Sequence, residues 1–169
     1  MNVDGGLNGV DITGAQTLLV GVAGSSQLDV YTNNPSPYIS VTAIAIPASN
    51  DQGIVQFNVN SNVFGDIGVA TNHVLHSLVA GDNTTVTFLG SVFATTMNVG
   101  VAVVNFNGGA AATNTVAPTF TGDGTIRLAP NSIVTGALVT NTDNTGTLAL
   151  GSGSHWTGAV GGPGASAGL

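Results

Sequence analysis

The sequence predicts an all-β fold, and within that class a right-handed parallel β-helix, in which short coils stack along one axis as a β-solenoid. Three observations lead to this prediction. The composition is rich in strand and turn formers, short phrases alternate apolar with polar residues, and Gly124–Thr140 returns in altered form as Gly146–Gly162.

The composition favours strands joined by tight turns. The 169 residues include 21 Thr, 17 Asn and 25 Gly, whereas Glu, Lys and Cys are absent. β-Branched residues favour strands, and Gly and Asn accept the positive φ angles that turns need. Helices depend on straight-chain residues such as Glu and Lys, which this chain lacks.

The alternating phrases predict where strands lie. Val55–Asn58 (VQFN), Val86–Gly90 (VTFLG) and Val104–Gly108 (VNFNG) place apolar residues at every second position. This is the pattern of a short strand with one buried face. Clusters of Gly, Asn, Asp and Ser between the phrases indicate turns.

One segment fits two structures. The apolar positions of Thr71–Gly81 (TNHVLHSLVAG) suit one helical turn as well as a strand, and Asn72 would cap such a turn. Of the two, we expect a strand, at Leu78–Ala80.

The repeat near the C-terminus predicts which residues stack. Gly124–Thr140 aligns with Gly146–Gly162 without a gap, and seven of the 17 positions are identical. We call these two segments the tandem repeat. Parallel coils of equal length place equivalent positions one strand spacing apart. We expect three pairs to stack inward, Ile126/Leu148, Leu128/Leu150 and Val134/Trp156, and three residues to face outward, Arg127, Ala149 and His155. Trp156 then fills the core rather than stacking on a sugar.

The repeat length also predicts the size of the solenoid. We treat residues 1–169 as a single solenoid domain, with repeats clearest in residues 53–162. At about 22 residues per coil, the chain would form about seven or eight coils. A Greek-key sandwich has equally short strands and frequent turns, and it is the main alternative.

Charge and hydropathy exclude several classes of partner. The net charge of −7 comes from eight scattered Asp against one Arg, and it disfavours binding to nucleic acid. No apolar run approaches the roughly 18 residues of a membrane-spanning helix. The opening stretch, MNVDGGLNGV, lacks the basic and apolar parts of a secretion signal.

Residues suited to catalysis or metal binding are few, so we expect no catalytic residue, no cofactor and no metal. His73 and His76 lack the spacing and the Glu of the metallopeptidase motif, and in a strand they would face opposite sides. No complete calcium-binding repeat occurs. We interpret the Asp residues as turn formers whose side chains bond nearby backbone amides.

Residues Gly65–Gly100 resemble the passenger region of rickettsial surface cell antigens, the autotransporters of the outer membrane protein A and B type. That family repeats a G-x-I-G-x-x-x-N phrase, a short apolar strand and a V-x-F-x-G-x-V/Y-x-A-T phrase. The matching residues here are Gly65, Ile67, Gly68, Asn72, Val86, Phe88, Gly90, Phe93, Ala94 and Thr95. Gly146–Gly158 (GTLALGSGSHWTG) resembles another coil of the family. The likeness is clearest over Gly53–Gly162.

The resemblance implies a passenger displayed on the bacterial outer membrane. Its partners would be neighbouring coils, a membrane β-barrel and a host-cell surface protein. Such proteins have a signal peptide and a C-terminal barrel, and neither is visible in this sequence, so we expect a fragment of a longer passenger. An isolated fragment would expose its end strands, and we expect end-to-end self-association.

Three classes of function are compatible with a charge-poor solenoid. We favour a non-enzymatic surface protein with a structural or adhesive role. The first alternative is a β-helical carbohydrate-active enzyme. Members of that class resemble one another in having clustered carboxylates and a Lys or Arg base, whereas Arg127 is the only Lys or Arg in this chain. The second is an ice-binding solenoid, but the Thr-x-Thr pairs start at unequal intervals, at residues 85, 113, 119, 140 and 145, which predicts no regular array.

Overall fold

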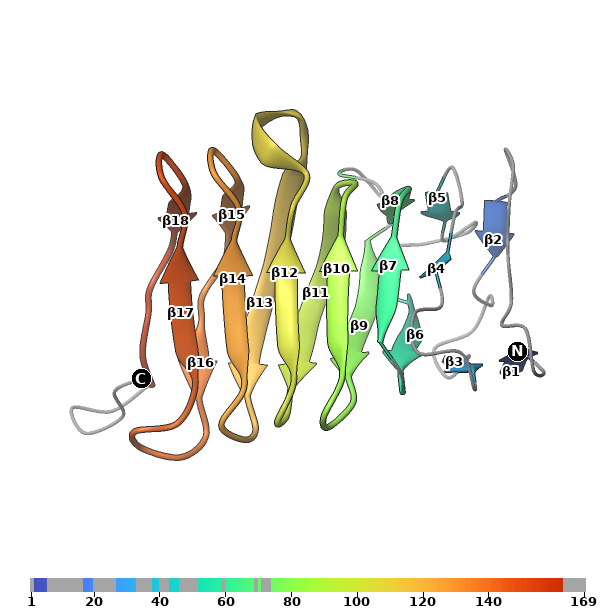
Figure 1. Ribbon diagram of the computed structural model, residues 1–169, viewed down its shortest axis with the longest axis horizontal. Helices are drawn as coiled ribbons and strands as arrows, with labels where there is room; N and C mark the ends of the chain where they lie inside the picture. Colours follow the sequence, from blue (N-terminus) through green and yellow to red (C-terminus); the bar gives the residue numbers. More distant parts are fainter. Residues whose placement is uncertain are drawn as a thin grey trace.

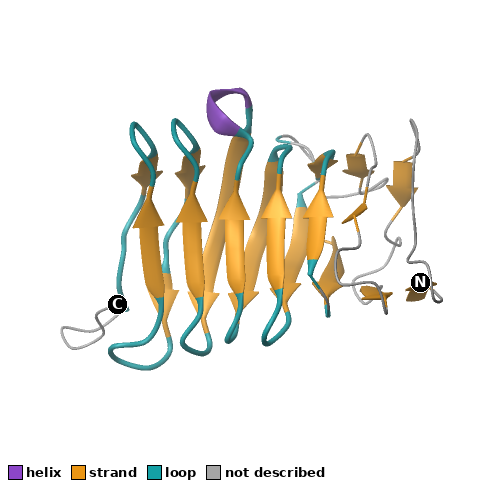
Figure 2. Cartoon of the chain, viewed as in Figure 1, coloured by secondary structure: helices purple, strands orange, loops and turns teal. Residues whose placement is uncertain are grey.

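The computed structural model confirms an all-β parallel solenoid (Figure 1). It describes residues 52–58, 60–68, 70 and 74–162, together with the backbone of five strands at 2–5, 17–19, 27–32, 38–39 and 43–45. The coils stack along the long axis, so that β1 and β18 lie near opposite ends (Figure 1). Among the described residues, the one helical element is a short 3-10 turn, η1 (Figure 2).

The strands are short and evenly distributed along the chain. Their bounds are β1 Asn2–Gly5, β2 Thr17–Leu19, β3 Gln27–Thr32, β4 Tyr38–Ile39, β5 Ala43–Ala45, β6 Gln52–Phe57, β7 Ser61–Val63, β8 Asp66–Ile67, β9 Leu75–Ala80, β10 Thr85–Phe88, β11 Val92–Val99, β12 Val103–Phe106, η1 Gly109–Ala111, β13 Thr113–Phe120, β14 Thr125–Leu128, β15 Ile133–Thr135, β16 Val139–Thr140, β17 Thr147–Leu150 and β18 His155–Thr157. The apolar positions between Thr71 and Gly81 suited either a helical turn or a strand, and Leu75–Ala80 is a strand, as expected. The strand begins at Leu75 rather than at Leu78. Asn72 lies outside the described residues.

The strands form two parallel sheets. The smaller sheet has the order β17-β14-β12-β10-β7-β4, and the larger one contains the other twelve strands. Two long strands span the larger sheet, and each pairs with two shorter strands of a neighbouring coil: β11 with β8 and β9, and β13 with β15 and β16. The larger sheet therefore has two strips. The first strip runs through β8, β15 and β18, and the second runs through β9 and β16.

The number of coils differs from the prediction. The described residues make about four turns, rather than seven or eight coils. The prediction divided all 169 residues by about 22 residues per coil, whereas this count covers the described residues. Within the smaller sheet, the interval between register partners is longest from Ser61 to Val86. The interval between Thr85 and Val103 is shorter, and the interval between Val103 and Thr125 is longer again. The loops between the strands differ in length, so the strands of successive coils remain paired in register despite these unequal intervals.

The core runs down the axis between the two sheets. Alternate residues of β10, β12 and β14 point inward and are at most 3% exposed: Val86, Phe88, Val104, Phe106, Ile126 and Leu128. The rings of Phe57, Phe88 and Phe106 follow one another along the axis, with centroids 5.9 and 5.7 Å apart. Stacking of like apolar residues is how each coil buries a face that it cannot cover alone.

All three stacked pairs expected from the tandem repeat are register partners, namely Ile126/Leu148, Leu128/Leu150 and Val134/Trp156. The earlier member of each pair is buried, whereas Leu148 and Trp156 are half-buried against the core and Leu150 is 55% exposed. These later members belong to the last described coil, which covers the coil before it and has no further described coil on its own outer side.

The residues expected to face outward are arranged largely as predicted. Arg127 and His155 are exposed on β14 and β18. Ala149 pairs with Arg127 on the same face of β17 and is half-buried.

Candidate functional site

The two described histidines, His76 and His155, lie on different strands and are not brought together. His76 is exposed on β9 and His155 is exposed on β18, whereas His73 lies outside the described residues. Within the part of the chain that the structure describes, no three His, Cys, Asp or Glu side chains gather as a potential metal site. Trp156 packs against the core, and its indole N–H donates a 2.9 Å hydrogen bond to the Gly136 carbonyl. These contacts agree with a core role for Trp156.

Three aspartate side chains form hydrogen bonds between one coil and the next. Three Asp Oδ1 atoms accept hydrogen bonds from backbone N–H groups of the following coil: Asp66 from Ser91 at 2.6 Å, Asp82 from Val101 at 2.8 Å and Asp123 from Gly146 at 3.2 Å. The expectation that these carboxylates bond nearby amides was wrong, because in a solenoid the turn of the next coil lies directly above. We call these contacts the coil clips.

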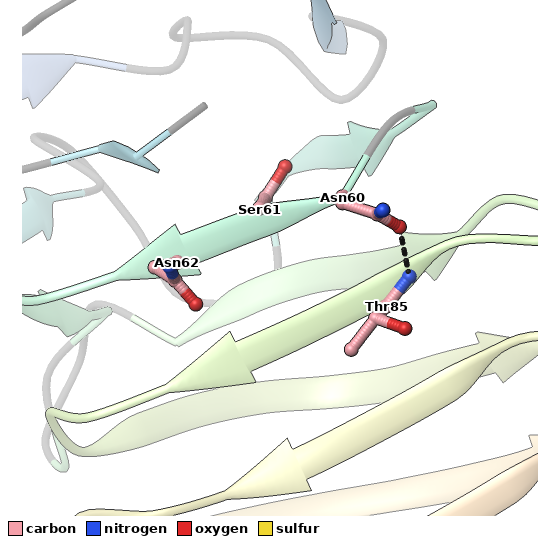
Figure 3. Close-up of a pocket in the computed structure, with 4 residues that line it drawn as sticks. All are labelled: Asn60, Ser61, Asn62 and Thr85. Carbon is pink, nitrogen blue, oxygen red and sulfur yellow. Dashed lines mark hydrogen bonds between the residues drawn. The ribbon is translucent and has the colours of Figure 1, made fainter. Parts of the chain in front are cut away.

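An uncharged side chain, that of Asn60, makes a similar contact between coils beside a small hollow near β7. The volume of this hollow is about 170 Å³, and it is lined by Asn60, Ser61, Asn62 and Thr85 (Figure 3). Asn60 Oδ1 accepts a 2.8 Å hydrogen bond from the Thr85 backbone N–H (Figure 3). Because this amide already joins β7 to β10, we assign it a structural role.

Three exposed threonines form a column on the outer side of the first strip. Thr115, Thr135 and Thr157 are register partners on β13, β15 and β18. Neighbouring parallel strands lie about 4.8 Å apart, so the column presents one hydroxyl at that spacing in each coil. The sequence predicted no regular array of Thr-x-Thr pairs, and this column consists of single threonines, of which only Thr115 belongs to such a pair. The intervals between them along the chain are unequal, and the loops absorb the difference.

A second hollow, the junction groove, lies where the two strips of the larger sheet meet. Its volume is about 260 Å³, and six of its lining residues define it: Ala94, Thr95, Thr115, Val116, Thr135 and Gly136. They come from three consecutive coils, on β11, on β13 and at the end of β15, so the groove runs along the solenoid axis. The three threonines are exposed, whereas Ala94 and Val116 are buried beneath them.

A bulge and a glycine shape this groove. Between Phe93 and Thr96, β11 has one residue more than the β13 segment that it pairs with. Bulges redirect side chains, and here Thr95 is exposed in the coil where Phe93, the partner of Thr115, is only 8% exposed. Gly136 has φ +149°, and a Cβ atom there would overlap the Val116 carbonyl. Glycine is thus required at this position.

Comparisons with known proteins found no match. No family model matches the chain, and neither the curated proteins nor the solved structures contain a match. Among the described residues, no helix is both long and apolar enough to span a membrane.

Proposed function

We propose that this chain is part of a bacterial surface passenger of the autotransporter type, with a structural or adhesive role at the outer membrane. It acts without catalysis, through an extended face that contacts a host-cell surface protein or neighbouring solenoids. The proposal rests on the sequence resemblance to rickettsial surface antigens and on a solenoid whose described surface carries few charged residues.

The residues that carry the resemblance have clear places in the coil. Val86 and Phe88 point into the core. A Cβ atom at Gly90 would lie 2.5 Å from the Gly65 carbonyl oxygen of the preceding coil. Gly65 and Gly90 therefore lie where two coils touch, and this agreement between phrase and architecture supports the proposal.

The placement of charge is the observation that favours a binding surface over an enzyme. Catalytic carboxylates converge in a pocket, where their environments tune their pKa values. Here Asp66, Asp82 and Asp123 each bond a backbone amide of the next coil. Arg127 is exposed on the smaller sheet, and no charged residue lies among the six that define the junction groove. These three carboxylates thus join neighbouring coils of the solenoid.

The threonine column gives the ice-binding alternative one observation in its favour. An ice-binding face needs hydroxyls and methyls ordered in two dimensions. The adjacent column on the same strip carries three different residues, Thr113, Ile133 and His155, so the regular array is only one threonine wide. Measurement of thermal hysteresis separates this function from adhesion, and we expect none.

A cell-binding assay tests the proposal. The purified 169-residue chain, labelled at an introduced cysteine, should bind cultured host cells saturably and be displaced by unlabelled chain. Parallel assays should show no release of unsaturated uronates or reducing ends from polysaccharides. Turnover of a polysaccharide together with an absence of cell binding would refute the proposal and favour the enzyme.

A further inference from the structure

We propose that the junction groove binds an extended, neutral glycan that lies along the solenoid axis with about one sugar per coil. This inference deepens the proposed function, because it names a class of ligand for the adhesive face. It rests on the shape of the groove, on the spacing of its hydroxyls and on the chemistry of its lining.

The spacing of the threonines suits a linear glycan. Thr115 and Thr135 lie on adjacent parallel strands, roughly 4.8 Å apart. The bulge in β11 adds the exposed Thr95 in the preceding coil. A pyranose in an extended glycan advances the chain by nearly this strand spacing, so successive sugars would meet successive hydroxyls. A ligand aligned across the strands, along the axis, uses one threonine from each coil.

The chemistry of the lining selects a neutral ligand. Threonine hydroxyls both donate and accept hydrogen bonds, as sugar hydroxyls do. The other two lining residues, Val74 and Ala117, are half-buried and supply small apolar surfaces against which the C–H faces of a pyranose would pack. None of the six defining residues is ionisable, so a charged ligand would lose hydration there without gaining a charged partner. The net charge of −7 further disfavours a polyanion.

The position of the groove disfavours a peptide. Peptides that extend a sheet pair with the backbone of an exposed edge strand. The groove lies over the middle of the larger sheet, where both sides of β13 are paired, with β11 and with β15 and β16. A peptide there would have only side-chain hydroxyls for its backbone groups, whereas a glycan is complementary to those hydroxyls.

The test is a binding titration with defined oligosaccharides. The full chain is titrated by NMR with neutral linear hexasaccharides of β-1,4-glucose, α-1,4-glucose and β-1,4-mannose, with an oligogalacturonate and with an uncharged Ser/Ala peptide. The groove variant is Thr115→Val/Thr135→Val, which removes two hydroxyls and keeps the branched shape. Its matched control is Thr125→Val/Thr147→Val, which changes two paired threonines on the outer side of the smaller sheet.

We expect at least one neutral hexasaccharide to bind weakly and to shift resonances around the groove. The groove variant should bind it about tenfold more weakly, from two lost hydrogen bonds, and the control variant should bind within about twofold of the native chain. Equal losses in both variants would overturn the inference. So would a failure of all three neutral sugars to bind, or equal binding of the oligogalacturonate or the peptide at the groove.

The same variants separate this inference from the proposed function. If the groove variant binds cells as the native chain does, and the hexasaccharides do not compete, the glycan inference fails and the adhesive role stands. If the chain binds a hexasaccharide through the groove and binds no cells, the adhesive role fails and the groove remains a glycan site.

Discussion

Two leucines in one stacked column provide a direct test of how the solenoid is stabilised. Leu128 and Leu150 are register partners on β14 and β17. Leu128 is covered by the next coil and is 3% exposed, whereas Leu150 belongs to the last described coil and is 55% exposed. Replacing each leucine with alanine therefore compares a buried leucine with a half-exposed one at the same position of the strand.

The expected costs differ by a factor of about three. Leu128→Ala should lower the free energy of unfolding by about 3 kcal/mol, within the range of roughly 2–5 kcal/mol for buried leucines. Full burial of a leucine contributes about 1.5–3 kcal/mol, and Leu150 is about half buried, so Leu150→Ala should cost about 1 kcal/mol.

Urea denaturation followed by far-UV circular dichroism measures both losses. The midpoint should fall clearly for Leu128→Ala and slightly for Leu150→Ala, with little change in the slope for either. Equal losses at the two positions would refute the reasoning, because a covered coil and an uncovered coil would then be energetically alike.

Three further predictions concern the clips, the tryptophan and the end of the solenoid. Asp82→Ala removes the hydrogen bond to Val101 and should cost about 1 kcal/mol in urea denaturation, whereas Asp82→Asn keeps an acceptor and should cost less. Trp156→Ala should cost about 2 kcal/mol, below the roughly 3–5 kcal/mol of a fully buried aromatic, and Trp156 should emit at shorter wavelength than free tryptophan; a fully solvated emission maximum would contradict its packing. Sedimentation velocity should show association that grows with concentration and that Leu150→Asp weakens, and a chain that stays monomeric throughout would exclude end-to-end contact.

The sequence was most informative where coil length is constant. The strands β14 and β17 occupy equivalent positions in the two copies of the tandem repeat, which align without a gap. The repeat therefore identified the register partners Ile126/Leu148 and Leu128/Leu150 directly. It was less informative about where each coil begins, because the loops between strands lengthen and shorten. A parallel ladder restores register after each loop, so coil boundaries depend on loop lengths that composition alone does not reveal.

The junction groove was the feature that sequence reasoning missed. Thr135 and Thr157 are identical positions of the tandem repeat, and this was the signal that a threonine column existed. Its extension to Thr115 follows a shorter interval, and its extension to Thr95 depends on a bulge. A bulge is an irregularity in the pairing of two strands that are distant in the sequence, so equal spacing of threonines along the chain does not indicate it.

A buried polar residue shows a second limit of pattern reasoning. Asn114 is 2% exposed, although alternation assigns apolar residues to inward positions. Its Oδ1 accepts a 3.1 Å hydrogen bond from the Val92 backbone N–H, and its Nδ2 donates a 2.9 Å bond to the Ile133 carbonyl. One side chain thus joins three consecutive coils, and only the stacked structure explains why an amide is tolerated there.

The central claim is that a parallel solenoid presents its threonines in register, one per coil, and a cysteine pair tests it most directly. The native chain has no Cys, so Thr135→Cys/Thr157→Cys introduces the only two thiols. Adjacent strands about 4.8 Å apart fall within the Cα separation of roughly 4.4–6.8 Å that a disulfide requires. Mild oxidation of dilute protein should close an intramolecular disulfide in this variant, and the control Thr135→Cys/Thr147→Cys, with its cysteines on different sheets, should stay reduced. Failure of the first pair to close, or equal closure of both, would contradict the account.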